Sequence, residues 1–316
     1  MNLPPIPPAE LLIDIARQDA LPAAGAATFV FAAGMAFGRW NAAFAAAFAM
    51  VAGYVAANFQ PVEHGEPLTL ETTHRLIPWV PDKPTFHSLP KAALVLTLVG
   101  LTSRWLGLIA GAILPKRFWW VPSLVVWVPR WAAVLVVGSW VIPQPMLEAN
   151  AWIKPALGAA MLLMWIAADA PARSGAGDQV AGLLAACFLA ASLVFIYAHS
   201  KRFMELATAL GCGFAGIAAV ARVARADTSG AVPAAVGFLP ALVLNVRYQT
   251  ESQVPVAAFW LLALAPLGML PFLIPRVTRQ NRWIVGSLRA LAVLLPLAIA
   301  AVLALQFEQL PPEEDW

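Results

Sequence analysis

The sequence predicts an all-α, polytopic integral membrane protein, and three observations lead to this fold class. About ten apolar stretches of near bilayer-spanning length run through the 316 residues. Hydrophobic residues make up 61% of the chain and charged residues only 12%, with a mean hydropathy of +0.75. A soluble domain of this length has too few charges to cover so much apolar surface. Tryptophans also lie at the ends of several stretches, at the depth of lipid headgroups that their amphipathic rings favour.

The N-terminal segment, residues 1–21, is predicted to be amphipathic and to lie at the membrane interface. Its polar residues fall at helical spacing on one face: Glu10, Asp14, Arg17 and Gln18. Its apolar residues fall on the opposite face: Leu11, Leu12, Ile15 and Ala16. The alternative is a helical leader that packs on the membrane domain.

Residues 22–306 are predicted to form a single transmembrane helical domain, followed by a short acidic tail at 307–316. A crossing helix needs about 20 apolar residues. Ten stretches meet or approach this length: 22–38, 41–58, 92–114, 120–142, 151–168, 180–199, 203–224, 230–246, 255–275 and 284–306. The stretch at 230–246 is short and holds Pro233 and Pro240, so a broken or re-entrant segment is the alternative there. Nine crossings is then the alternative count.

One connection, residues 59–90, is long and rich in proline. It holds three of the four histidines of the chain, His64, His74 and His87. Loops of this length are often functional, and we expect this one to be the contact surface if the protein has a partner in a membrane complex. The histidine spacings match no known metal-ligand pattern, so the sequence predicts no metal site and no cofactor.

The sharpest pattern lies in the stretch at 92–114, where one helical face carries small residues around a single arginine. The face comprises Ala93, Thr97, Gly100, Arg104, Gly107 and Gly111. Small residues allow another helix to approach closely in a membrane. We therefore expect this face, and Arg104 with it, to point into the bundle, where an intramembrane charge is usually found.

The next stretch, 120–142, adds Arg130 directly after Pro129. Trp127 is three residues earlier on the same face and can make a cation–π contact with Arg130. From the rise of about 1.5 Å per residue, Arg104 and Arg130 lie at nearly the same depth on neighbouring antiparallel helices. Two cations this close in a low dielectric repel each other unless something neutralises them.

Two interpretations of this arginine pair remain open. Glu205 is the one carboxylate clearly inside a predicted span, so Glu205 and free backbone carbonyls can satisfy both arginines. Alternatively, an anion such as a lipid phosphate, a carboxylate metabolite or the acidic group of a cofactor binds between Arg104 and Arg130. The second interpretation makes Arg104, Arg130, Glu205 and Trp127 a candidate ligand-binding site, and it requires the two guanidinium groups to face the same space.

Two other signals indicate packing rather than chemistry. The glycines of GCGFAG (Gly211, Gly213 and Gly216) match a phosphate-binding pattern, but they lie in the middle of a span, where glycine allows close helix approach. Cys187 and Cys212 lie in different spans without CxxC spacing, as expected of small apolar residues.

Three functions are compatible with these features. The first is binding or transport of an anionic or amphiphilic small molecule, including an anionic lipid. The second is a non-catalytic subunit or assembly factor of a larger membrane complex. The third is a membrane enzyme that acts on a lipid-linked substrate with loop histidines as general acid or base, although no catalytic motif is present.

Basic residues sit mostly at helix ends, which fits a lipid bilayer and no nucleic-acid partner. Alanine-rich spans and the preference for arginine over lysine point to a bacterial inner membrane.

Overall fold

The regular secondary structure is entirely helical in the part of the chain that the computed structural model describes. That part comprises residues 9–37, 42–58, 88–118, 120–141, 152–250, 252–274, 277 and 282–307. After the N-terminal segment, its α-helices are α2 (Leu21–Ala36), α3 (Ala42–Asn58), α5 (Ser88–Ile113), α6 (Val121–Val141), α8 (Ile153–Arg173), α9 (Gly177–Tyr197), α10 (Lys201–Ala224), α11 (Val232–Gln249), α12 (Val256–Leu264) and α14 (Arg282–Phe307). The prediction of an all-α fold is confirmed.

Eight helical stretches of the described residues are long and apolar enough to cross a bilayer. They are Ala9–Ala36, Leu94–Ile113, Val121–Gly138, Ile153–Arg173, Gly177–Tyr197, Phe203–Ala224, Val256–Leu273 and Trp283–Gln306. The chain is therefore a multi-pass membrane protein. The apolar part of α3, Ala42–Ala57, is shorter than these eight, and α11 is not among them. A count of ten crossings stays a prediction.

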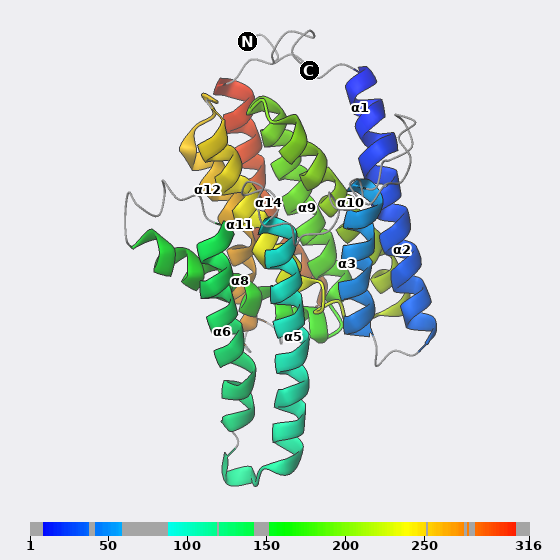
Figure 1. The fold of residues 1–316 in the computed structure, drawn as a ribbon, viewed down its shortest axis with the longest axis vertical. Helices are drawn as coiled ribbons and strands as arrows, with labels where there is room; N and C mark the ends of the chain where they lie inside the picture. The colour runs from blue at the N-terminus through cyan, green and yellow to red at the C-terminus, as the bar shows by residue number, and fades with distance from the viewer. Residues whose placement is uncertain are drawn as a thin grey trace.

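The helices surround the α9–α10 pair, which runs through the centre of the bundle (Figure 1). The antiparallel pair α2–α3 packs on α10, and α12 and α14 pack on α9 from the other side. The core contains large side chains with no exposed surface, among them Trp165, Phe188 and Phe195. Cys187 is buried in this core and Cys212 is half-buried, and both are free thiols, as expected of packing residues.

Helix α11 is an inner helix of the bundle. All of its residues from Val232 to Val246 are buried, and it contacts α5, α8, α9 and α12. A helix that is covered on every side can be apolar all round, and its polar Asn245 donates to the carbonyl of Ala241 at 2.7 Å. The predicted alternative of a broken segment is wrong, because α11 continues through Pro240 without interruption.

The N-terminal segment and the first membrane helix form one continuous helical stretch. α1 (Ala9–Ile15) passes into a π-helical turn, η1 (Ala16–Ala20), and then into α2 without a non-helical residue. The turn η1 contacts α3 and α10, so this segment packs on the membrane domain. An interfacial position for residues 1–21 stays a prediction. Most of the 59–90 connection and the tail from residue 308 lie outside the described residues.

The proline-rich span near residue 260 changes its helical geometry. It is an α-helix up to Leu264 and a 3₁₀-helix, η5 (Ala265–Leu273), beyond. The change begins one residue before Pro266, and Pro271 lies further along η5. A 3₁₀ run of this length is uncommon. A 3₁₀-helix is narrower than an α-helix, and η5 packs against α8 and α14.

The α5–α6 hairpin extends well past the ends of the other helices (Figure 1). Its outer half begins at Arg104, and the nine residues from there to Ile113 give it a length of about 14 Å. Large apolar side chains cover this half and are exposed: Trp105, Leu106, Leu108, Ile109, Ile113, Trp120, Leu124 and Val128. The tip, which includes η4 (Lys116–Phe118), carries Arg117, whose Cζ lies 4.8 Å from the ring centroid of Phe118. Such a surface is stable in hydrocarbon and such a tip suits the headgroup level, so we expect the hairpin to stand in the bilayer.

The glycines of GCGFAG lie inside α10, where they allow close approach of its neighbours. A Cβ atom on Gly216 would lie 2.6 Å from Thr28 Oγ1 and 2.7 Å from the carbonyl of Ala24, both in α2. A Cβ on Gly211 would lie 2.8 Å from Leu189 Cγ in α9. The interpretation of this motif as helix packing is confirmed.

We expect Gly216→Ala to destabilise the protein by about 1–3 kcal/mol, because the added methyl group overpacks the α2–α10 contact. The matched control is Gly182→Ala in α9, where a Cβ would meet nothing within 4 Å and the helix propensity of alanine favours the change. The measurement is the thermal unfolding of both variants in detergent. Equal stability of the two variants would contradict the packing role of Gly216.

Candidate functional site

Arg130 lies in α6 with only 1% of its surface exposed, and each guanidinium nitrogen donates a hydrogen bond. Nε donates to Ser103 Oγ at 3.0 Å, Nη1 to Asp169 Oδ2 at 3.0 Å, and Nη2 to the carbonyl of Gly100 at 3.2 Å. The ring centroids of Trp127 and Trp165 lie 4.8 and 4.9 Å from Cζ. The predicted cation–π contact with Trp127 is confirmed. Arg130 is therefore satisfied within the fold and joins α5, α6 and α8.

Asp169, in the last turns of α8, is the carboxylate that neutralises Arg130. Its side chain is 5% exposed, and Oδ2 also pairs with Arg173 Nη2 at 2.5 Å. The interpretation of Glu205 as the one carboxylate inside a span was wrong, because α8 continues past the predicted end at residue 168. The spacing of Asp169 and Arg173, four residues apart, is a helical ion-pair signal that could have found it.

Arg104 points to a different element. Its Nη2 pairs with Asp227 Oδ2 at 2.8 Å, and its Nη1 donates to Ser229 Oγ at 3.0 Å. Asp227 and Ser229 lie in the connection between α10 and α11, where the Ser229 amide donates to Asp227 Oδ1 at 2.8 Å. The side chains of Arg104 and Asp227 are 28% and 20% exposed. This pair therefore lies nearer to the surface than the pair of Arg130.

The predicted common depth of the two arginines is confirmed, since Arg130 bonds to Ser103, the neighbour of Arg104. Their guanidinium groups nevertheless face different elements, and each has its own aspartate. The hypothesis of an anion held between Arg104 and Arg130 required both guanidinium groups to face the same space, so it is wrong in this form. Of the three arginines in these two ion-pair clusters, Arg104 and Arg173 are partly exposed and can be reached by an external anion, whereas Arg130 is buried.

Glu205 is not brought to the arginines. It lies in the second turn of α10, near Asp19 of η1 and Lys201. The arginine pairs lie beyond the other end of α10, and the 19 residues from Glu205 to Ala224 span about 28 Å. Of the four predicted site residues, the structure brings together Arg104, Arg130 and Trp127 and leaves Glu205 apart.

We call the end of the bundle that contains these pairs the basic end. Two further contacts belong to it: Arg222 Nη1 pairs with Asp178 Oδ2 at 3.0 Å, and Arg289 Nη1 donates to Gln179 Oε1 at 3.3 Å. Its charged residues among those described are Arg104, Arg130, Arg173, Arg222, Arg225, Arg289, Asp169, Asp178 and Asp227. Six arginines thus face three aspartates, a formal excess of three positive charges. A site of this composition attracts phosphate and carboxylate groups.

Comparison of the chain with protein-family models, curated proteins and solved structures finds no match in any of the three. The functional argument therefore depends on the geometry of the chain itself.

We expect Asp169→Ala to destabilise the protein by about 3–5 kcal/mol, because it leaves the buried Arg130 without its counter-ion. The matched control is Asp178→Ala. Its partner Arg222 has a 64% exposed side chain, so breaking that pair should cost about 1 kcal/mol or less. Thermal unfolding in detergent measures both. A small effect of Asp169→Ala, similar to the control, would show that Arg130 does not depend on this carboxylate.

Proposed function

We propose that this membrane protein binds or transports an anionic or amphiphilic small molecule at its basic end. The observation that carries the proposal is the excess of arginine there together with the partial exposure of Arg104 and Arg173. A guanidinium group has five N–H donors. Among the described residues, Arg173 uses one of its nitrogens in the ion pair with Asp169, and Arg104 uses two in its contacts with Asp227 and Ser229, so both retain donors for phosphate or carboxylate oxygens.

The position of the basic end beside the α5–α6 hairpin favours an amphiphile. The exposed apolar half of the hairpin starts at the depth of Arg104 and continues away from the bundle. If this half stands in hydrocarbon, the arginines lie about 14 Å from the hairpin tip, within the depth of one bilayer leaflet. A lipid-like anion can then place its charged group at Arg104 and Arg173 and its hydrocarbon chain along the hairpin. The arginines thereby gain a counter-ion, and the apolar side chains of the hairpin gain an apolar partner.

We expect the double variant Arg104→Gln, Arg173→Gln to lose a bound anionic adduct that the wild-type protein retains. The fold should persist, because the buried ion pair between Asp169 and Arg130 is unchanged. Asp227 loses its partner Arg104, but its side chain is partly exposed to solvent. Loss of two charge-assisted contacts should weaken binding at least about tenfold. The measurement is native mass spectrometry after gentle extraction from the membrane, which also identifies the adduct by its mass.

The matched control is Arg247→Gln, in the last turn of α11 at the opposite end of that helix. It removes one arginine without touching the basic end, so its adduct should match the wild type. An adduct that persists in the double variant, or that is equally lost in Arg247→Gln, would contradict the proposal.

A second candidate function is a subunit or assembly factor of a membrane complex. The exposed apolar surface of the α5–α6 hairpin favours it, since such surfaces often mark contacts with protein or lipid. The contact surface predicted from the sequence, the 59–90 connection, lies mostly outside the described residues, as do His64, His74 and His87 of the enzyme hypothesis. A stoichiometric protein partner in the same mass spectrum would select the subunit function over binding of a small molecule.

A further inference from the structure

We infer that a groove between α12–η5 and α14 holds the hydrocarbon chain of an anionic lipid whose headgroup binds Arg289. The inference rests on the proposed function and deepens it, because it names the class of ligand and the place of both its charged group and its chain. It is carried by two observations: an apolar groove in the membrane region, and a buried arginine, three residues beyond the last groove residue of α14, that the fold leaves incompletely satisfied.

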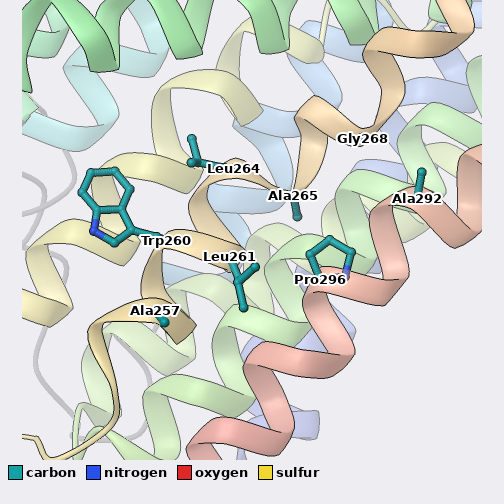
Figure 2. Close-up of a pocket in the computed structure, with 8 residues that line it drawn as sticks. All are labelled: Ala257, Trp260, Leu261, Leu264, Ala265, Gly268, Ala292 and Pro296. Atoms are coloured by element: carbon teal, nitrogen blue, oxygen red, sulfur yellow. The ribbon is translucent and has the colours of Figure 1, made fainter.

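The groove has a volume of about 350 Å³ and an apolar lining. Figure 2 shows Leu261 and Ala265 on one wall pointing toward Pro296 of α14 on the other. The two walls belong to stretches that are long and apolar enough to cross the bilayer, so the medium at the groove is lipid hydrocarbon. An apolar groove in that medium accepts a lipid chain rather than a polar molecule.

The shape of the groove follows from the local sequence. Small residues line both walls of the groove: Ala265, Gly268 and Ala292. At Gly268 the backbones approach so closely that a Cβ atom would clash with the carbonyl of Ala292. The change from α-helix to the narrower 3₁₀-helix at Ala265 contributes to the same space.

Arg289 lies where the groove meets the basic end. It precedes Ala292 by three residues and Pro296 by seven, so all three lie on one face of α14. The axial rise from Arg289 to Ala292 is about 4.5 Å. On the other wall, Phe272 follows Gly268 by four residues, and its ring centroid lies 5.7 Å from Arg289 Cζ. Arg289 and Phe272 therefore lie one layer beyond the Gly268–Ala292 contact that bounds the groove, on the side of the basic end.

The guanidinium group of Arg289 is incompletely satisfied, in contrast to that of Arg130. Arg289 is 5% exposed, its Nε has no hydrogen-bond partner, and its Nη1 has one long bond to Gln179. No aspartate or glutamate among the described residues forms an ion pair with it. A buried charge without a counter-ion is unfavourable, and a phosphate group supplied by a lipid would provide it. The carboxamide of Gln179 adds a donor beside the same position.

The test uses the full chain in nanodiscs that contain either phosphatidylglycerol or phosphatidylcholine, each with a photoactivatable group on the acyl chain. We expect phosphatidylglycerol to label peptides of α12–η5 and α14 about tenfold more than phosphatidylcholine, because only the former carries a net negative charge. Arg289→Gln should lower the labelling by phosphatidylglycerol to the level of phosphatidylcholine, and Arg289→Lys should retain part of the preference. Equal labelling by both lipids in the wild type would overturn the inference.

Two further variants test the groove itself. Ala292→Phe fills it and should abolish labelling by both lipids, whereas Ala298→Phe places the same side chain on the exposed face of α14 and should leave labelling unchanged. Equal effects of the two variants would contradict a chain in the groove.

The stability of Arg289→Gln in lipid-free detergent separates a ligand role from an internal one. The melting temperature should not fall, because the substitution removes a charge that lacks a carboxylate partner in the fold. A large fall in the melting temperature would show that contacts of Arg289 within the protein stabilise the fold, and it would overturn the inference.

The outcomes also separate this inference from the proposed function. If the adduct depends on Arg104 and Arg173 but labelling of the groove shows no headgroup preference, the proposed function stands and the groove is not its lipid site. If no anionic adduct and no headgroup preference occur, both fail.

Discussion

The ion pair between Arg130 and Asp169 is the constraint on which the arrangement of the bundle depends. An arginine within an apolar helix must find acceptors inside the protein, and Arg130 takes them from two other helices, Ser103 and Gly100 of α5 and Asp169 of α8. These bonds fix the relative height of the three helices. Because Asp169 lies near the end of α8 while Ser103 and Arg130 lie near the middle of their hairpin, α5 and α6 must continue beyond the rest of the bundle. The protruding hairpin is thus a consequence of where one carboxylate sits.

The connection between α10 and α11 completes the basic end by binding α5 of this framework and attaching two further helices, α9 and α3, to it. Asp227 and Ser229 bind Arg104 of α5, and Thr228 donates to the carbonyl of Gly177 at the start of α9 at 3.0 Å. Gly230 approaches the backbone of Ala43 in α3 so closely that a side chain would not fit. This short segment contains a single acidic residue, yet it holds together helices from three parts of the chain. Its rigidity keeps Arg104 turned away from Arg130, so that each cation has a separate carboxylate.

Hydropathy and helical spacing were sufficient to predict the all-α membrane fold, the common depth of Arg104 and Arg130, and the contact of Trp127. They failed where a tertiary partner decides the outcome. Asp169 was missed because a length criterion ended its helix at residue 168, before Pro171, whereas the ion pair with Arg173 continues the helix through that proline. Glu205 was preferred because it lies inside a predicted span, but depth along a helix says nothing about the end of the bundle to which a residue belongs. Asp227 lies outside any apolar stretch, so no hydropathy pattern could assign it to Arg104.

The contrast between Arg130 and Arg289 shows how a structural charge can be told from one that is available to a ligand. Both are buried arginines on membrane helices, and both lie against aromatic rings. Arg130 has three hydrogen bonds, one of them to the carboxylate of Asp169, so its burial is compensated. Within the described part of the chain, Arg289 has one long hydrogen bond to a neutral side chain, so the cost of burying its charge is not offset by a carboxylate there. An apolar side chain of similar length would fill the same position more favourably, unless the charge interacts with an anion that enters from the membrane. The lipid that we infer in the neighbouring groove would supply that anion.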